Sequence, residues 1–171
     1  MKNVIKTTVL MLALVSFVSC KNETKNDKNI SNSDTATMAA LSFEDKNVGK
    51  QFQHYIHLKT AFVNSDMDEA KSGAKMLFEN SDDAALKELL SKILEASDIE
   101  EQRTLFSDVT EKMTGIVTES ISSGKVYQQY CPMAFSNEGG YWLSTEKEIR
   151  NPYFGDKMLK CGSVTETIEK Q

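Results

Sequence analysis

Two sulfur pairs near the C-terminus are the side chains best suited to chemistry in this chain. Cys131 is followed two residues later by Met133, and Met158 precedes Cys161 by three residues. Side chains at i and i+2 of an extended segment share a side, and side chains at i and i+3 of a helical turn share a face. Each pair can therefore offer a thiolate and a thioether in one direction. If the two pairs meet, the four sulfurs form a soft ligand set that selects copper(I) or another soft metal ion.

A disulfide between Cys131 and Cys161 is the competing interpretation, and it needs no metal. Such a bond would close a loop of about 30 residues and contribute ~3–4 kcal/mol to stability. An oxidising compartment permits it. The flanking methionines favour the metal, because a disulfide has no use for a thioether. Zinc fits this set less well than copper(I), since zinc prefers histidine to methionine.

His54 and His57, the only two histidines, are possible additional metal ligands. They lie at i and i+3 of an expected helix, so both can face one point. Pairing of Cys131 with His54 as nucleophile and base is a third alternative. The cysteines form no C-x-x-C motif and have no local activating motif. We therefore expect no enzymatic activity.

The first residues resemble an export signal with a lipid attachment site. Lys2 and Lys6 precede an apolar run, 7–18, which is shorter than the ~20 residues of a membrane-spanning helix. This pattern predicts a signal peptide over residues 1–19. Ser19 before Cys20 resembles a bacterial lipobox, so we expect acyl chains on Cys20 and a membrane anchor. An ordinary signal peptide cleaved nearby is the alternative.

Composition divides the rest of the chain into a tether and one domain. Residues 20–43 comprise the lipidated cysteine and a polar stretch that reads as a flexible tether. Residues 44–165 are enough for a single domain with its own core. The formal net charge is −5. No cluster of basic residues is present, which excludes a nucleic-acid partner on electrostatic grounds.

The body of the domain is expected to be helical. No proline occurs between residues 45 and 122, and apolar residues recur with a helical period. Four helices are predicted, and short connections should make neighbours antiparallel. The first helix is expected to begin at about Asp45. Capping residues mark the starts of the next three helices and a glycine marks the last end: Ser65-Asp66, Asn80-Ser81, Ser97-Asp98 and Gly124. The predicted fold class is mainly α, an antiparallel up-and-down four-helix bundle.

A small Cys-Met module, residues 125–165, is expected to follow the bundle. Residues 126–130 and 141–144 have the composition of strands and are separated by a turn at 136–140, which predicts a β-hairpin. Residues 155–161 are expected to form a short helical turn that puts Met158 and Cys161 on one face.

Several segments resemble a bacterial family classed as domain of unknown function 3347. These segments are 58–66, 130–134, 141–144, 146–158 and 161–162, and the resemblance extends over about residues 45–165. The family is similar to modules attached to periplasmic adaptor subunits of heavy-metal efflux pumps, and its stand-alone members are exported lipoproteins. The resemblance implies handling of copper or a related metal, with an efflux adaptor as partner and no enzymatic activity.

These observations predict a lipid-anchored protein of the cell envelope that faces the periplasm. Its expected function is to bind a soft metal, copper(I) foremost, for sequestration or for hand-over to a metal efflux system. The alternative is a non-catalytic structural or interaction module of the envelope, closed by a Cys131–Cys161 disulfide.

Overall fold

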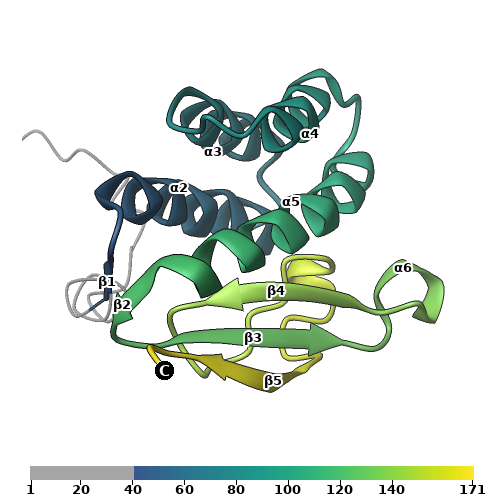
Figure 1. Ribbon diagram of the computed structural model, residues 1–171. Helices are drawn as coiled ribbons and strands as arrows, with labels where there is room; N and C mark the ends of the chain where they lie inside the picture. The colour runs from purple at the N-terminus through teal and green to yellow at the C-terminus, as the bar shows by residue number, and fades with distance from the viewer. Residues whose placement is uncertain (1–40) are drawn as a thin grey trace, which may run out of the picture. The chain divides into compact units, whose positions relative to one another are not determined.

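The computed structural model describes residues 41–171 and shows a mainly helical protein with two small antiparallel sheets (Figure 1). The predicted signal peptide, Cys20 and most of the predicted tether lie outside the described residues. The first strand, β1 (Ser42–Phe43), falls inside the segment predicted to be the tether. The predicted domain boundary at residue 44 was therefore two residues too late.

Four long helices make up the body: α2 (Lys46–Val63), α3 (Met67–Glu79), α4 (Ala84–Glu95) and α5 (Ile99–Ser120). Each begins after an aspartate whose carboxylate accepts a backbone N–H of the first turn, which satisfies a donor that lacks a helical partner. The four caps are Asp45, Asp66, Asp83 and Asp98.

The start of α4 was predicted too early. Asn80-Ser81 was expected to open this helix, whereas the N-cap is Asp83, which accepts the N–H of Leu86. The Ser81 hydroxyl instead accepts the N–H of Asp83 at 3.2 Å. Ser81 therefore stabilises the turn that precedes the helix, and the carboxylate further along caps it.

The end of α5 was predicted too late. The helix ends at Ser120, and β2 (Ile121–Ser123) pairs with β1 in an antiparallel arrangement. The N–H of Glu44 donates to the carbonyl of Ser120 at 2.7 Å, so pairing with the start of the domain draws this segment out of the helix. Gly124 has a left-handed φ of 81°, but it occupies the turn after β2 rather than the helix end.

The second sheet has the strand order β4-β3-β5 and is antiparallel throughout. It contains the two predicted strands, β3 (Val126–Cys131) and β4 (Gly140–Ser144), and a third strand, β5 (Ser163–Ile168), that was not predicted. The domain therefore extends beyond the predicted end at residue 165. A short irregular turn, α6 (Ala134–Asn137), connects β3 to β4.

Helices α2 and α5 lie between the α3–α4 pair and the β4-β3-β5 sheet (Figure 1). Tyr55 of α2 joins these layers. Its hydroxyl lies 2.8 Å from Thr110 Oγ1 of α5 and accepts the backbone N–H of Leu143 of β4 at 2.9 Å. The tyrosine is fully buried. Burial raises the pKa of its hydroxyl far above the ordinary value, so Tyr55 stays neutral.

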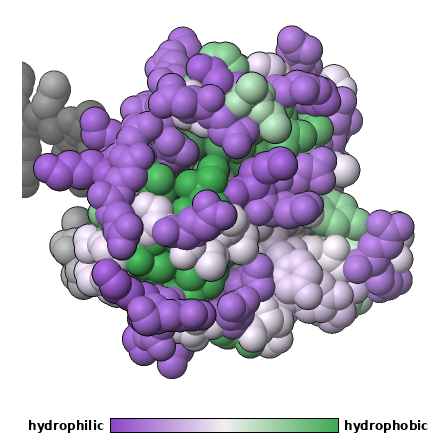
Figure 2. All heavy atoms as spheres, viewed as in Figure 1, coloured by the Kyte–Doolittle hydropathy of each residue, from purple (hydrophilic) through white to green (hydrophobic). Residues whose placement is uncertain are grey.

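A chain of aromatic rings continues from the helices to the loop after β4. Ring centroids lie 6.0 Å apart for Phe52 and Tyr55, 5.3 Å for Tyr55 and Phe106, and 6.1 Å for Phe106 and Tyr153. Figure 2 shows apolar side chains between a mostly hydrophilic covering on this face.

Within residues 41–171, no helix has the length and apolar character needed to cross a membrane.

Replacing Tyr55 by phenylalanine should destabilise the fold by about 1–3 kcal/mol, because the buried N–H of Leu143 loses its acceptor. The free energy of unfolding, measured in urea, checks this. Tyr141→Phe is the matched control, since Tyr141 is 46% exposed, and its effect should stay within about 0.5 kcal/mol. Equal stability of the two variants would contradict the bridging role of Tyr55.

Candidate metal centre at the end of the sheet

The structure brings the two predicted thiols together. Cys131 Sγ and Cys161 Sγ lie 2.6 Å apart, and both residues are free cysteines. This separation falls between a disulfide bond of about 2.05 Å and the roughly 3.5–4 Å between two sulfurs that share a metal ion. Cys131 is fully buried, whereas Cys161 is partly exposed. One thiol is therefore fixed in the sheet and the other lies nearer the surface.

The position of Cys131 follows from the end of β3. Cys131 pairs with Gly140 of β4. A side chain at residue 140 would meet the rings of Tyr153 and Phe135, at 2.7 and 2.9 Å from its first carbon. Glycine therefore lets both aromatic rings pack closely beside the cysteine.

Asn151 holds the loop that carries Cys161. It is fully buried, and its side-chain amide donates to the carbonyl of Cys161 at 2.9 Å. Its backbone N–H donates to the carbonyl of Leu159, and its side-chain oxygen accepts the N–H of Tyr153 at 2.8 Å. Both ends of the loop are thus fixed by one buried side chain.

Arg103 of α5 fixes the same loop from the helical side. Its side chain is 3% exposed and donates to three acceptors on two other segments, the carbonyls of Pro152 and Phe62 and the hydroxyl of Ser65, at 2.8, 2.9 and 3.0 Å. Its charge is paired with Glu100 at 2.8 Å. Arg103 was not among the predicted site residues. Position 103 lies four residues after Ile99 on the apolar face of α5, and this periodicity was the available signal.

The electrostatic environment keeps the thiol of Cys161 protonated near neutral pH. Its hydrogen bond with Cys131 is the main cause that raises the pKa of Cys161 to about 11, followed by burial and the charge of Cys131. The backbone N–H of Met133 hydrogen-bonds to Cys161 and acts in the opposite direction. A bound metal ion would have to displace this proton.

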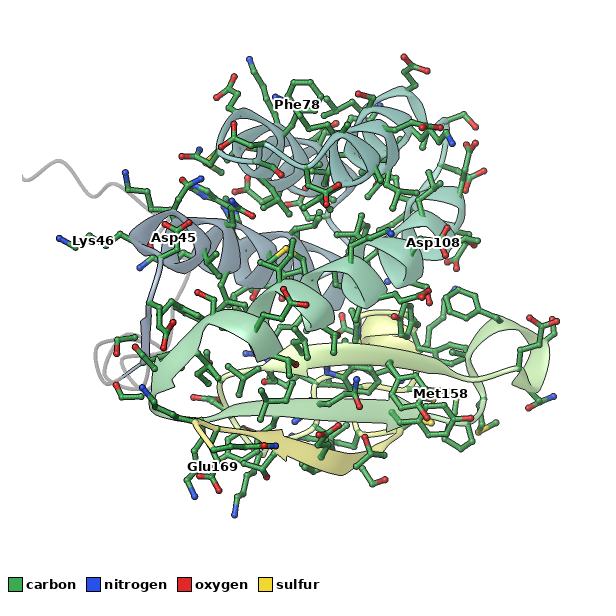
Figure 3. The ribbon with its side chains drawn as sticks, in the orientation of Figure 1. Asp45, Lys46, Phe78, Asp108, Met158 and Glu169 are labelled. Carbon is green, nitrogen blue, oxygen red and sulfur yellow. The ribbon has the colours of Figure 1, made fainter. Side chains whose placement is uncertain are left out.

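The two methionines line one cavity of about 450 Å³ next to the thiols, but its lining includes neither cysteine. Figure 3 labels Met158 beside the end of the sheet. The local structure around each methionine differs from the prediction. The extended segment ends at Cys131, and Met133 has helical backbone angles. The helical turn spans only Gly155–Lys157 rather than 155–161.

The two histidines lie elsewhere on the described part of the chain. His57 Nε2 is 2.5 Å from Glu69 Oε1 of α3. Tyr55, two residues earlier, points to the sheet, and two residues turn a helix by about 200°. Burial and the neighbouring His57 lower the pKa of His54. His57 thus belongs to the α2–α3 contact, and no three His, Cys, Asp or Glu side chains of residues 41–171 form a metal-binding group.

The site is thus a contact between two thiols on a β module that packs against a helical body. The family model described as "Protein of unknown function (DUF3347)" matches residues 52–124, which supports the predicted resemblance to this family. The match begins in α2 and ends at the turn after β2, so it covers the long helices but none of the four candidate ligands at positions 131, 133, 158 and 161. No curated protein and no solved structure matches the chain.

Alkylation of the reduced protein should modify Cys161 before Cys131, because only Cys161 is accessible. With a pKa of about 11, the rate should still rise about tenfold per pH unit between pH 8 and 10, since the thiolate is the reactive form. Peptide mapping after iodoacetamide treatment measures both effects. The denatured protein is the control, and its rates should level off near pH 9. The same levelling in the folded protein would contradict the raised pKa.

Proposed function

We propose that this protein binds a soft metal ion, with copper(I) favoured, and sequesters it or hands it to a metal efflux system. The contact between Cys131 and Cys161 is the observation that supports this proposal most. Met133 and Met158 add two thioethers in the neighbouring cavity. Thiolates and thioethers together select copper(I) over magnesium or calcium.

Binding would replace the thiol protons and separate the two sulfurs. Their distance has to grow from 2.6 Å to roughly 3.5–4 Å around an ion. Cys131 is buried in a paired strand, whereas Cys161 is partly exposed in a loop whose backbone Asn151 holds, so the movement falls on the side chain of Cys161. Two thiolates suit copper(I), which accepts few ligands. Zinc takes four ligands and prefers histidine, so zinc is the poorer fit.

In this proposal the helices are an inert scaffold, an antiparallel up-and-down four-helix bundle that carries the Cys-Met module. The protein is not an enzyme. Cys20 holds the lipid that anchors it to the membrane, facing the periplasm, and an adaptor subunit of a heavy-metal efflux pump is the partner. The apolar run before Cys20 and the family resemblance support the location and the partner.

Competition for copper(I) with a chromophoric chelator, under reducing conditions, tests the metal proposal. Cys131→Ser/Cys161→Ser should weaken binding by more than about 100-fold, because loss of even an outer partner of a metal ligand costs 10–100-fold. Met76→Leu, on α3, is the control and should bind like the wild type. Equal affinities of the wild type and the double serine variant would remove the thiol site.

A structural or interaction module closed by a disulfide is the second candidate function. The sulfur separation of 2.6 Å favours it, since this is only about 0.5 Å longer than a disulfide bond. In such a module the cysteines would hold the loop of residues 145–162 to β3. Exposed aromatic residues such as Tyr141 would then contact a partner protein.

Quenching the protein with an alkylating reagent directly on isolation tests this candidate. A disulfide-closed module would show no free thiol, and its reduction should lower the free energy of unfolding by ~3–4 kcal/mol. Capture of an efflux adaptor that survives Cys131→Ala and Met133→Ala would support the interaction role. Two free thiols on isolation would contradict a module closed by a disulfide.

A further inference from the structure

Met133 and Met158 line a cavity whose lining does not include the two cysteines. We propose that Met133 and Met158 form an outer binding station for a soft monovalent cation, separate from the Cys131–Cys161 pair. The station would receive the ion from solvent and pass it to the thiols. This inference rests on the proposed soft-metal function and deepens it by giving the ion a route.

Packing does not account for Met133. A methionine that fills a core is buried, as Met113 is here at 0% exposure, whereas Met133 is 46% exposed. Met133 and Met158 share the lining of one cavity with the aromatic residues Phe135, Tyr153 and Phe154. At about 450 Å³ the cavity far exceeds the ~30 Å³ share of one water molecule, so a hydrated ion can enter it.

The cavity wall next to Met133 is a strained turn. Phe135, Ser136 and Asn137 all have left-handed backbones, with φ of 51°, 58° and 74°. Side chains other than glycine rarely adopt such backbone angles, and strain of this kind concentrates at functional sites. The Phe135 ring packs on Tyr153 at 4.8 Å, and the N–H of Gly139 donates to the carbonyl of Ala134 at 2.9 Å. Packing and hydrogen bonding therefore hold the wall in place.

Backbone hydrogen bonds connect both methionines to Cys161. The N–H of Met133 hydrogen-bonds to the Cys161 thiol, and the N–H of Cys161 donates to the carbonyl of Met158 at 2.9 Å. An ion held by the thioethers would thus lie beside the two segments that hydrogen-bond to the residue with the accessible thiol. Transfer then requires only that Cys161 lose its proton and exchange for a thioether as ligand.

The chemistry of the two sulfur types makes the stations separable. A thioether has no proton to lose, so its affinity for the ion does not fall as the pH is lowered, whereas a thiol has to release a proton before it binds. A thioether also cannot form a disulfide. Because the outer station uses only the two thioethers as ligands, it survives removal of the cysteines. Thioethers prefer copper(I) and silver(I) to zinc or magnesium. Nearby Glu100 is paired with Arg103, which leaves the cavity without an unpaired carboxylate from this residue.

Calorimetric titration of the full chain with silver nitrate, in chloride-free buffer, tests the station. The Cys131→Ser/Cys161→Ser variant should retain one site, at least about 100-fold weaker than that of the wild type. Adding Met133→Leu and Met158→Leu, which conserve volume, should abolish this residual site. Adding Met76→Leu instead should leave it intact, and its affinity should be the same at pH 6 and pH 8. Circular dichroism confirms that each variant is folded.

Equal silver binding by the double serine variant with and without the two methionine substitutions would overturn the station. So would a residual site that disappears between pH 8 and pH 6. Failure of the proposed thiol site looks different: the wild type and the double serine variant would then bind silver alike, whatever the methionines do.

Discussion

The buried guanidinium of Arg103 is the interaction on which the sulfur-bearing end of the molecule depends. Taking this charge out of water is costly, and the ion pair with Glu100 together with three neutral acceptors offsets the cost. Two of these acceptors, the carbonyls of Phe62 and Pro152, belong to different segments. The end of α2 and the loop after β4 are therefore held to α5 by one side chain, and Asn151 continues the connection to Cys161.

The helices could be predicted because their signals are local. Asp66 and Asp98 cap the backbone N–H groups three residues away, and such a contact needs no tertiary partner. The elements that were predicted wrongly depend on pairing with distant parts of the chain. The end of α5 depends on a strand some 80 residues earlier in the chain. The β5 strand is mostly polar and almost entirely exposed, so its sequence lacks the alternation of apolar and polar residues that predicts a half-buried strand.

At the candidate site, the residue types indicated which side chains meet, but the local structure expected around the methionines was wrong. Soft side chains pointed to Cys131 and Cys161, and the contact between them agrees with that choice. The methionines were placed by assuming an extended segment and a helical turn, and both assumptions failed because β3 ends at Cys131 and the 3-10 turn is short. Arg103 was missed because a charged residue in the first turns of a helix usually faces water.

The direction of β3 determines where the sulfur pair lies relative to the start of the described chain. Residue 41, where the described chain begins, adjoins β1, and β1 pairs with β2 just before β3 starts. Cys131 ends β3, about 17 Å further along. Figure 1 shows β1 and the tip of the sheet at opposite sides of the domain. The sulfur pair therefore lies at the side of the domain away from the point where the described chain begins, so a contact made near β1 would leave Cys161 accessible.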